Sequence, residues 1–244
     1  TIPIHARRCL YGAFFIFKHS DTMAKKKNND ELQPYTEYLE HLSRNHDRSG
    51  VFNDFLTMIV CTLSMQQKEE EYLATIRKYT KEEVELFVKA FASLVLWMET
   101  HPLEDAFGDY FQQYISKGHN AQFFTPPAVT KMMAAMIGPG DKDGPVYDPC
   151  CGSGRFFLAA AQENRAISFV GGDITEACCK MTLVNACLND IVGEVYHMDS
   201  LRMEIWRCWR IERLPVLRLP YIRELPVARQ VSVQESDGAS QAAG

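Results

Sequence analysis

Hydrophobic positions recur at helical spacing through the first half of the chain, where no strand-like alternation of any strength is found. The run 51–65 is apolar on most sides, which is typical of a buried helix. Amphipathic helices are expected beside it at 67–79, 80–100 and about 104–117. The helix at 80–100 has its own start signal, because Thr80 followed by Glu83 is the pattern of a capping box. We therefore predict an all-helical N-terminal domain over residues 34–118.

Beyond residue 138 the pattern changes, and short apolar runs alternate with helical segments. Strands are expected at 145–148, 167–173 and 194–200, and helices at 156–164 and 175–190. Strand–helix–strand order with short connections is typical of a parallel sheet with crossover helices. We therefore predict that residues 119–201 form an α/β core, which follows the helical domain.

The alternation weakens after Asp199. Residues 201–230 contain seven arginines and three glutamates, and their prolines allow only one weak strand, 214–222, at a sheet edge. We expect residues 202–244 to form a basic, proline-containing C-terminal segment that is partly disordered. The arginines of residues 202–229 either contact phosphate groups or another subunit, or belong to a solvated chain end.

Composition narrows the class of protein. A net charge of −5 and a hydrophobic content of 46% are ordinary for a soluble globular chain, so any basic binding surface must be local. No run of about 18 apolar residues is present, and we expect no membrane span and a cytoplasmic location. Residues 1–33 are expected to be a disordered leader or upstream sequence, because Met23 begins the string MAKKKNNDE, which is typical of a natural start.

The eight cysteines do not follow the spacing of a zinc site. Two pairs are adjacent in the sequence, and no Cys-x-x-Cys motif occurs. We interpret the cysteines as reduced thiols that serve as small buried apolar groups, and we expect no metal ion.

The three predicted strands each end on an acidic residue. Asp148, Asp173 and Asp199 are 25 and 26 residues apart, and each interval is about one strand–helix unit. Because ligands of parallel sheets bind beyond the carboxyl ends of the strands, the three carboxylates are expected along one edge. A single acid at a strand end is also a common turn or helix cap, so the prediction depends on having all three in register.

A glycine turn follows the first acid, and its surroundings distinguish between ligands. Gly152 and Gly154 let the backbone approach a ligand closely, and the next helix points its N-terminus at the site. Asp148 would repel a pyrophosphate and attract an ammonium group, whereas the acids after the next strands suit ribose hydroxyls and an adenine amine. This combination favours S-adenosylmethionine over NAD or ATP, and a dinucleotide-dependent enzyme is the weaker alternative.

Four segments of the sequence together resemble one family. They are QFFTPPAVTKMM (122–133), VYDPCCGSGRFFLAA (146–160), VGGDIT (170–175) and HMDSL (197–201). The family is that of the N6-adenine DNA methyltransferases, and the likeness is to the modification (M) subunit of type I restriction-modification systems. It covers roughly residues 45–201 and implies a Rossmann-like S-adenosylmethionine-dependent methyltransferase core, here partial, with an all-helical N-terminal domain. The implied partners are DNA and a specificity or restriction subunit.

The resemblance also implies which residues bind the cofactor. Phe124 and Thr125 would contact its methionine end, Asp173 its ribose and Asp199 its adenine. The remaining positions are Gln122, Phe123 and Pro126 in the first segment, Asp148, Gly152, Ser153 and Gly154 in the glycine turn, and Ile174 and Leu201 on either side of the adenine ring. Two alternatives stay open: the first segment can be a buried aromatic turn before the helix at Ala128, and the last two residues can belong to the core.

The chain departs from the pattern of the family in two ways. Arg155 stands where the family usually has glycine, which predicts a turn closer to the helix or an additional charge near the site. The catalytic motif Asn/Asp-Pro-Pro-Tyr/Phe is absent, and the nearest string, RLPY at 218–221, has no amide. We therefore assign no catalytic residue. The resemblance predicts an adenine N6 DNA methyltransferase, and the missing motif leaves a catalytically inactive cofactor- or DNA-binding paralogue or fragment as the alternative.

Overall fold

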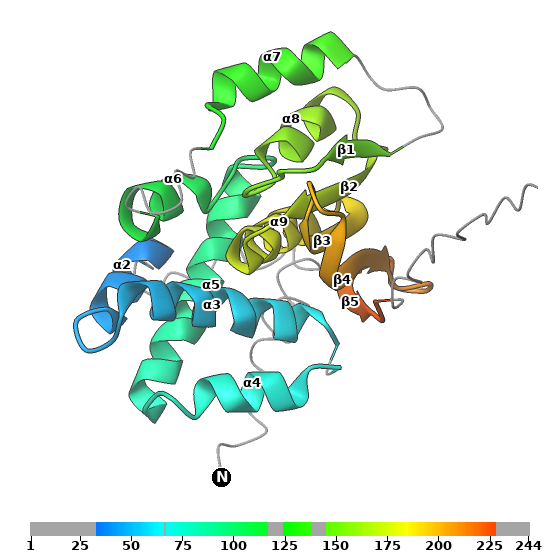
Figure 1. Ribbon diagram of the computed structural model, residues 1–244. Helices are drawn as coiled ribbons and strands as arrows, with labels where there is room; N and C mark the ends of the chain where they lie inside the picture. The colour runs from blue at the N-terminus through cyan, green and yellow to red at the C-terminus, as the bar shows by residue number, and fades with distance from the viewer. Residues whose placement is uncertain (1–32, 66, 117–123, 138–144, 228–244) are drawn as a thin grey trace, which may run out of the picture.

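The computed structural model describes residues 33–65, 67–116, 124–137 and 145–227. Figure 1 shows a helical part of the chain beside a part built on a sheet. The predicted leader lies outside the described residues, apart from its last position. In the described ranges, no helix combines the length and the apolar character that a membrane span needs.

Helices form the first part of the chain, as the sequence predicted. They are α2 (Tyr35–Leu42), α3 (Arg48–Leu63), α4 (Glu69–Ile76), α5 (Lys81–Thr100) and α6 (Gly108–Tyr110), followed by the π-helical turn η1 (Phe111–Ile115). The capping box of α5 is confirmed, because Thr80 Oγ1 accepts from Glu83 N at 3.2 Å and Glu83 Oε2 accepts from Thr80 N at 2.9 Å. The buried aromatic rings of Tyr35, Phe52 and Phe107 pack edge to face at the centre of this part.

The predicted parallel sheet is confirmed by strand order and register. The strands β1 (Val146–Asp148), β2 (Ser168–Asp173) and β3 (Val192–Asp199) lie side by side and parallel, and the crossovers between them are α8 (Arg155–Glu163) and α9 (Glu176–Leu188). Right-handed crossovers between neighbouring strands place both helices on one face of the sheet. Phe157 of α8 stacks on Phe169 of β2 at 4.4 Å, and α3 packs against α9. The helical part therefore covers the helix-bearing side of a Rossmann-like core.

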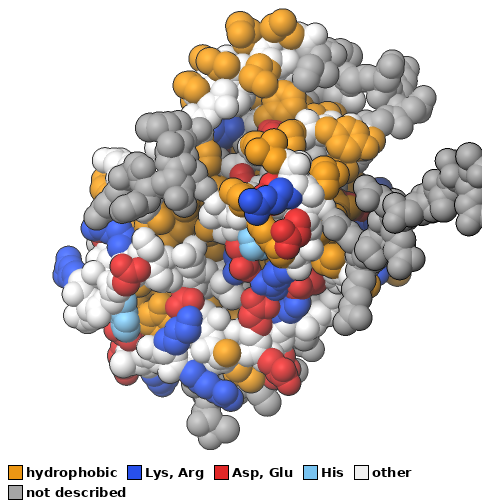
Figure 2. All heavy atoms as spheres, viewed as in Figure 1, with side chains coloured by type: hydrophobic (Ala, Val, Ile, Leu, Met, Phe, Trp, Pro, Cys, Tyr) orange, Lys and Arg blue, Asp and Glu red, His pale blue; other side chains and the backbone are white. Residues whose placement is uncertain are grey.

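The helix α7 (Pro127–Ile137) packs against α8 and leaves an apolar surface on its outer side. Thr130 and Ala134 are buried, whereas Val129, Met132, Met133 and Met136 are exposed. In Figure 2 hydrophobic side chains gather at the upper end of the molecule, over this helix.

The last part of the sheet differs from the sequence prediction. The strands β4 (Glu204–Arg213) and β5 (Pro220–Leu225) are antiparallel and continue the sheet in the order β1-β2-β3-β4-β5. The weak strand expected at 214–222 is wrong for residues 214–219, because they connect β4 to β5. Only its last three residues lie in a strand, at the start of β5. The many arginines conceal the alternation of apolar and polar positions along β4, in which Trp209 and Ile211 are buried on the same face of the strand. The sheet thus continues past the boundary predicted at residue 201.

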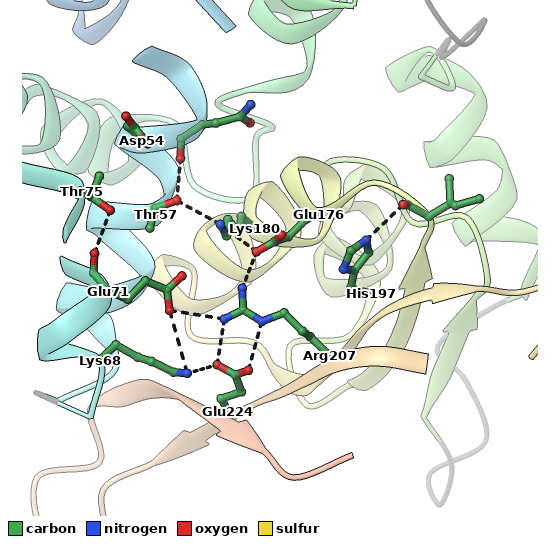
Figure 3. A network of polar contacts seen from close by, with 12 residues as sticks. Asp54, Thr57, Lys68, Glu71, Thr75, Glu176, Lys180, His197, Arg207 and Glu224 are labelled. Carbon is green, nitrogen blue, oxygen red and sulfur yellow. Dashed lines mark hydrogen bonds and ion pairs between the residues drawn. The ribbon is translucent and has the colours of Figure 1, made fainter. Parts of the chain in front are cut away.

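Arg207 of β4 joins this hairpin to the helical part, as Figure 3 shows. Its guanidinium donates two hydrogen bonds to Glu224 of β5, at 3.1 and 3.0 Å, and also contacts Glu176 of α9 and Glu71 of α4. Lys180 of α9 pairs with Glu176 at 2.9 Å. Since only 25% of the Arg207 side chain is exposed, these pairs are less screened by water than surface pairs are.

We expect Arg207→Met to lower the free energy of unfolding by about 2 kcal/mol, because three half-buried carboxylates lose a shared partner. Arg210→Met is the matched control, since Arg210 points to the opposite face of the same strand and is 42% exposed beside Glu194. Its loss should cost less than about 1 kcal/mol. Urea denaturation of both variants measures the difference, and equal losses would contradict the role of the network.

Candidate functional site

The sheet brings the three predicted carboxylates to one edge. Asp148, Asp173 and Asp199 are the last residues of β1, β2 and β3, which are parallel neighbours. The register pairs Asp148 with Gly171 and Asp173 with His197, so the three strand ends are staggered by only a few residues. The common edge predicted from the 25- and 26-residue spacings is therefore present.

Asp173 ties the glycine turn to the second strand. Its Oδ2 accepts from Gly152 N at 3.0 Å and its Oδ1 accepts from Thr175 N at 2.8 Å. The residue is 8% exposed, and burial raises the pKa of its carboxyl above the ordinary value. Asp173 therefore fixes both the glycine turn after β1 and the start of α9.

Glycine is required at position 152 by backbone conformation and by space. Gly152 has a φ of +57°, and a Cβ atom there would lie 2.7 Å from Cε1 of the Phe124 ring. The carbonyl of Gly152 accepts from Thr182 Oγ1 of α9 at 2.9 Å. Gly154, with a φ of +84°, is the residue immediately before α8. The turn is therefore held from α9 and covered by an aromatic ring.

Phe124, Thr125 and Pro126 precede α7, and the structure shows how they meet the turn. The Phe124 ring is partly buried against the hydrophobic core and lies 5.6 Å from the ring of Phe111 in η1. Thr125 and Pro126 are exposed. The alternative of a buried aromatic turn before the helix stays open, because Phe124 is partly buried and α7 begins directly after Thr125 and Pro126. Gln122 and Phe123, which the sequence also assigned to this segment, lie outside the described residues.

The Ser153 side chain points toward the helical part of the chain. Its side chain is buried, and Oγ donates to Asp105 Oδ2 at 2.6 Å. The Ser153 carbonyl accepts from Asn185 Nδ2 at 2.9 Å. This residue therefore links the turn to the helical part of the chain.

Asp105 was missed by the sequence analysis, although much of the site depends on it. Its buried carboxylate accepts five hydrogen bonds of 2.6–3.1 Å, from the backbone N–H groups of Phe107 and Gly108 and from the side chains of Ser153, Arg155 and Asn185. The side-chain partners are 48 to 80 residues away in the sequence. The only local signal was the Asp-x-x-Gly turn pattern at 105–108.

Arg155 occupies the position that is usually glycine in the family, and its charge is neutralised inside the protein. The side chain is 9% exposed, and Nε lies 2.6 Å from Asp105 Oδ2. A second nitrogen of the guanidinium pairs with Asp109, and Nη1 donates to the Thr125 carbonyl at 3.3 Å. The additional charge expected near the site is therefore directed toward the helical part.

The other two acids of the row are partly buried, and each accepts hydrogen bonds from the residues that follow it. Asp148 Oδ1 accepts from Cys150 N at 3.0 Å, and partial burial raises the pKa of its carboxyl. Asp199 Oδ1 accepts from the N–H groups of Leu201 and Arg202, each at 3.0 Å. Both carboxylates thus stabilise the turns that follow their strands.

Ile174 and Leu201 are 61% and 97% exposed, although both are large apolar residues. Each follows a strand-end acid by one or two positions. The alternative that they belong to the core is therefore wrong. Their exposure at the ligand edge is compatible with contact to a planar ring, and this role stays a prediction.

Six of the seven described cysteines are buried, and Cys150 is exposed. The interpretation of buried apolar thiols is thus confirmed for Cys61, Cys151, Cys178, Cys179, Cys187 and Cys208. Burial raises the pKa of the Cys61 thiol to about 12 and that of Cys208 to about 11. Within the described ranges, no three His, Cys, Asp or Glu residues are grouped as a metal would require.

Five arginines of the basic segment are paired with acids of this chain: Arg202 pairs with Asp199 at 3.7 Å, and the other four lie in β4 and β5. Arg207 binds the glutamates described above, Arg210 pairs with Glu194, Arg213 with Asp190, and Arg223 with Glu212. The solvated-end alternative is wrong for the four arginines of β4 and β5, because they lie within the sheet. The RLPY string lies at the connection between the two strands, which is the sheet edge opposite to the row of acids.

Known proteins resemble this part of the chain. Residues 100–213, from the end of α5 to the end of β4, match the family described as N-6 DNA Methylase. The type I restriction enzyme MjaIX methylase subunit of Methanocaldococcus jannaschii is 26% identical over 113 residues, which cover 41% of this chain and 20% of that protein. A putative class I S-adenosylmethionine-dependent methyltransferase of Listeria monocytogenes has a TM-score of 0.43 and 15% identity over 82% of this chain and 55% of that one.

The family match confirms the resemblance to N6-adenine DNA methyltransferases that the sequence motifs indicated. It includes Asp105, the glycine turn and all three acids of the row. It supports S-adenosylmethionine as the cofactor for which this part of the chain is built. The chain spans about a fifth of the length of the curated relative that it matches.

We expect Gly152→Ala to weaken both the fold and cofactor binding, because the new Cβ meets the Phe124 ring and a positive φ is unfavourable. The free energy of unfolding should fall by about 2 kcal/mol. Gly50→Ala is the control, since a Cβ there meets nothing closer than 3.5 Å in α3 and should stabilise by about 0.5 kcal/mol. Urea denaturation measures the stability of both variants, and calorimetric titration with S-adenosylmethionine measures cofactor binding. A Gly152→Ala protein with unchanged stability and unchanged binding would contradict this geometry.

Proposed function

We propose that this chain is the cofactor-binding part of an adenine N6 DNA methyltransferase similar to a type I modification subunit. The observation that carries the proposal is the row of strand-end acids beside a glycine turn, inside the segment that matches the methylase family. DNA is the proposed substrate, and a specificity or restriction subunit is the proposed partner.

The residues at the ligand edge fit S-adenosylmethionine from one end to the other. Asp148 suits the ammonium group, Asp173 the ribose hydroxyls and Asp199 the adenine amine, because carboxylates accept hydrogen bonds from each. Ile174 and Leu201 are exposed where an adenine ring would need apolar contacts. Acids in this arrangement disfavour a phosphate-bearing ligand. When bound, the cofactor supplies a methyl group on a positively charged sulfur, and these residues orient it.

The substrate side of the reaction is not explained by the described residues. The strand that follows β3 is antiparallel, so β4 begins at the ligand edge and ends at the opposite one. RLPY, the string that the sequence analysis found nearest to the catalytic motif, therefore lies far from the acids along the strands. This position favours a second candidate function: a protein that binds the cofactor but does not catalyse methyl transfer on its own.

We expect the purified chain to bind S-adenosylmethionine and not NAD in calorimetric titration, and Asp173→Ala to weaken binding at least tenfold. The reason is that the variant removes both the proposed ribose acceptor and the anchor of Gly152. Asp54→Ala is the control, because Asp54 pairs with Lys78 and Tyr79 in the helical part. Binding of NAD in preference to the methyl donor would overturn the assignment.

Transfer of labelled methyl groups to adenine-containing DNA separates the two candidates. We expect little or no transfer by the isolated chain. Transfer that depends on an added partner polypeptide would support the methyltransferase assignment. Robust turnover by the chain alone would show that its catalytic groups lie outside the motif we sought.

We expect cofactor affinity to fall as the pH is lowered from neutrality. Burial raises the pKa of the Asp148 carboxyl, so this group takes up a proton at a higher pH than an ordinary aspartate, whose pKa is about 3.9. The neutral acid no longer attracts an ammonium group. Asp148→Asn keeps an acceptor for Cys150 N and removes the charge. Titrations at several pH values should show a flatter profile for this variant, and identical profiles would exclude Asp148 as the cause.

A further inference from the structure

Arg155 connects three parts of the site with one side chain. It begins α8, directly after the glycine turn, and its Nε lies 2.6 Å from Asp105 Oδ2. The same guanidinium pairs with Asp109 of α6 and donates from Nη1 to the carbonyl of Thr125 at 3.3 Å. Its Cζ also lies 5.7 Å from the centre of the Phe124 ring, within the range of a cation–π interaction.

These contacts bear on one end of the proposed cofactor site. Phe124 covers Gly152, as the position of a Cβ built there shows. Gly152 follows β1, whose last residue is Asp148, so the ring lies at the β1 end of the row of acids. Asp199 ends β3, two strands away. A residue that holds Phe124 in place should therefore affect the amino-acid end of the ligand and not its adenine end.

We propose that Arg155 is a positioning residue that holds Phe124 and Thr125 over the glycine turn, and thereby sets affinity for the amino-acid half of the cofactor. The proposal rests on the cofactor assignment made above. Arg155 does not contact the ligand edge itself, because its nitrogens are directed at Asp105, Asp109 and the Thr125 carbonyl.

The three contacts of residue 155 require the branched guanidinium group of an arginine. Its planar guanidinium reaches three acceptors at once, on α6, on the preceding loop and on the segment before α7. A lysine ammonium at this place could neutralise Asp105 but could not span all three acceptors. Arg155→Lys therefore separates the positioning role from the role of the charge in stability.

The test compares two probes that differ only in the amino-acid half: S-adenosylhomocysteine and 5′-methylthioadenosine. We expect Arg155→Lys to weaken binding of S-adenosylhomocysteine about tenfold and to leave binding of 5′-methylthioadenosine unchanged within about twofold. A purely structural defect would lower the affinity for both probes alike. Calorimetric titration of the full chain provides both constants, and thermal unfolding shows whether each variant is folded.

Two further variants keep the test decisive. Phe124→Leu removes the ring while Arg155 and its acids stay, and it should show the same selective loss for S-adenosylhomocysteine. Arg213→Lys is the matched control, because Arg213 pairs with Asp190 at the far edge of the sheet and should change neither constant. If Arg155→Lys binds both probes as the parent does, or loses both equally, the positioning role is overturned. If the parent chain binds neither probe, it is the cofactor assignment that fails.

Discussion

The buried carboxylate of Asp105 is the interaction on which the arrangement of the site depends. It receives hydrogen bonds from Phe107 and Gly108 at the start of α6, from the glycine turn, from the first residue of α8 and from Asn185 in the last turn of α9. A buried charge is stable only when it is paired and hydrogen-bonded, and Arg155 supplies the opposite charge. Gly108 is part of the same arrangement, since a Cβ there would lie 2.8 Å from the Ser153 hydroxyl and from Arg155 Nη2. The helical part of the chain thus contacts the glycine turn directly.

Polar contacts hold α9 near both of its ends. Asn185 and Asn189 bond to the loop that follows α5: Asn185 Nδ2 reaches Asp105 at 2.9 Å, and Asn189 Oδ1 accepts from Leu103 N at 2.8 Å. Arg207 attaches the hairpin to α9 and α4. α9 is therefore held from both ends by polar contacts, while its cysteines and aliphatic residues fill the interior. This explains how a helix with little amphipathic character is accommodated: it is buried on nearly every side.

Local signals determined how much could be predicted. The capping box of α5 and the alternation of β1, α8, β2, α9 and β3 depend on residues close in sequence, and both were found. The hairpin was missed because Pro215, Pro220 and several arginines hide the period-two pattern that Trp209 and Ile211 carry. Asp105 was missed for a different reason, since its side-chain partners are brought together only by the tertiary fold. The ligand edge was predictable because parallel strands align their ends, whereas the support behind it was not.

Strand direction also limits where the remaining chemistry can come from. A parallel strand beside β3 would bring another carboxyl end to the row of acids, but β4 is antiparallel and brings its amino end, Glu204, instead. β5 returns toward that edge, yet it is two strands from β3, which at about 4.8 Å per strand is roughly 10 Å. Its Arg223 pairs with Glu212 and its Glu224 with Arg207 and Lys68, so these charged side chains already have partners in the chain. Among the described strands, those after β3 therefore bring no further parallel carboxyl end beside the row of acids.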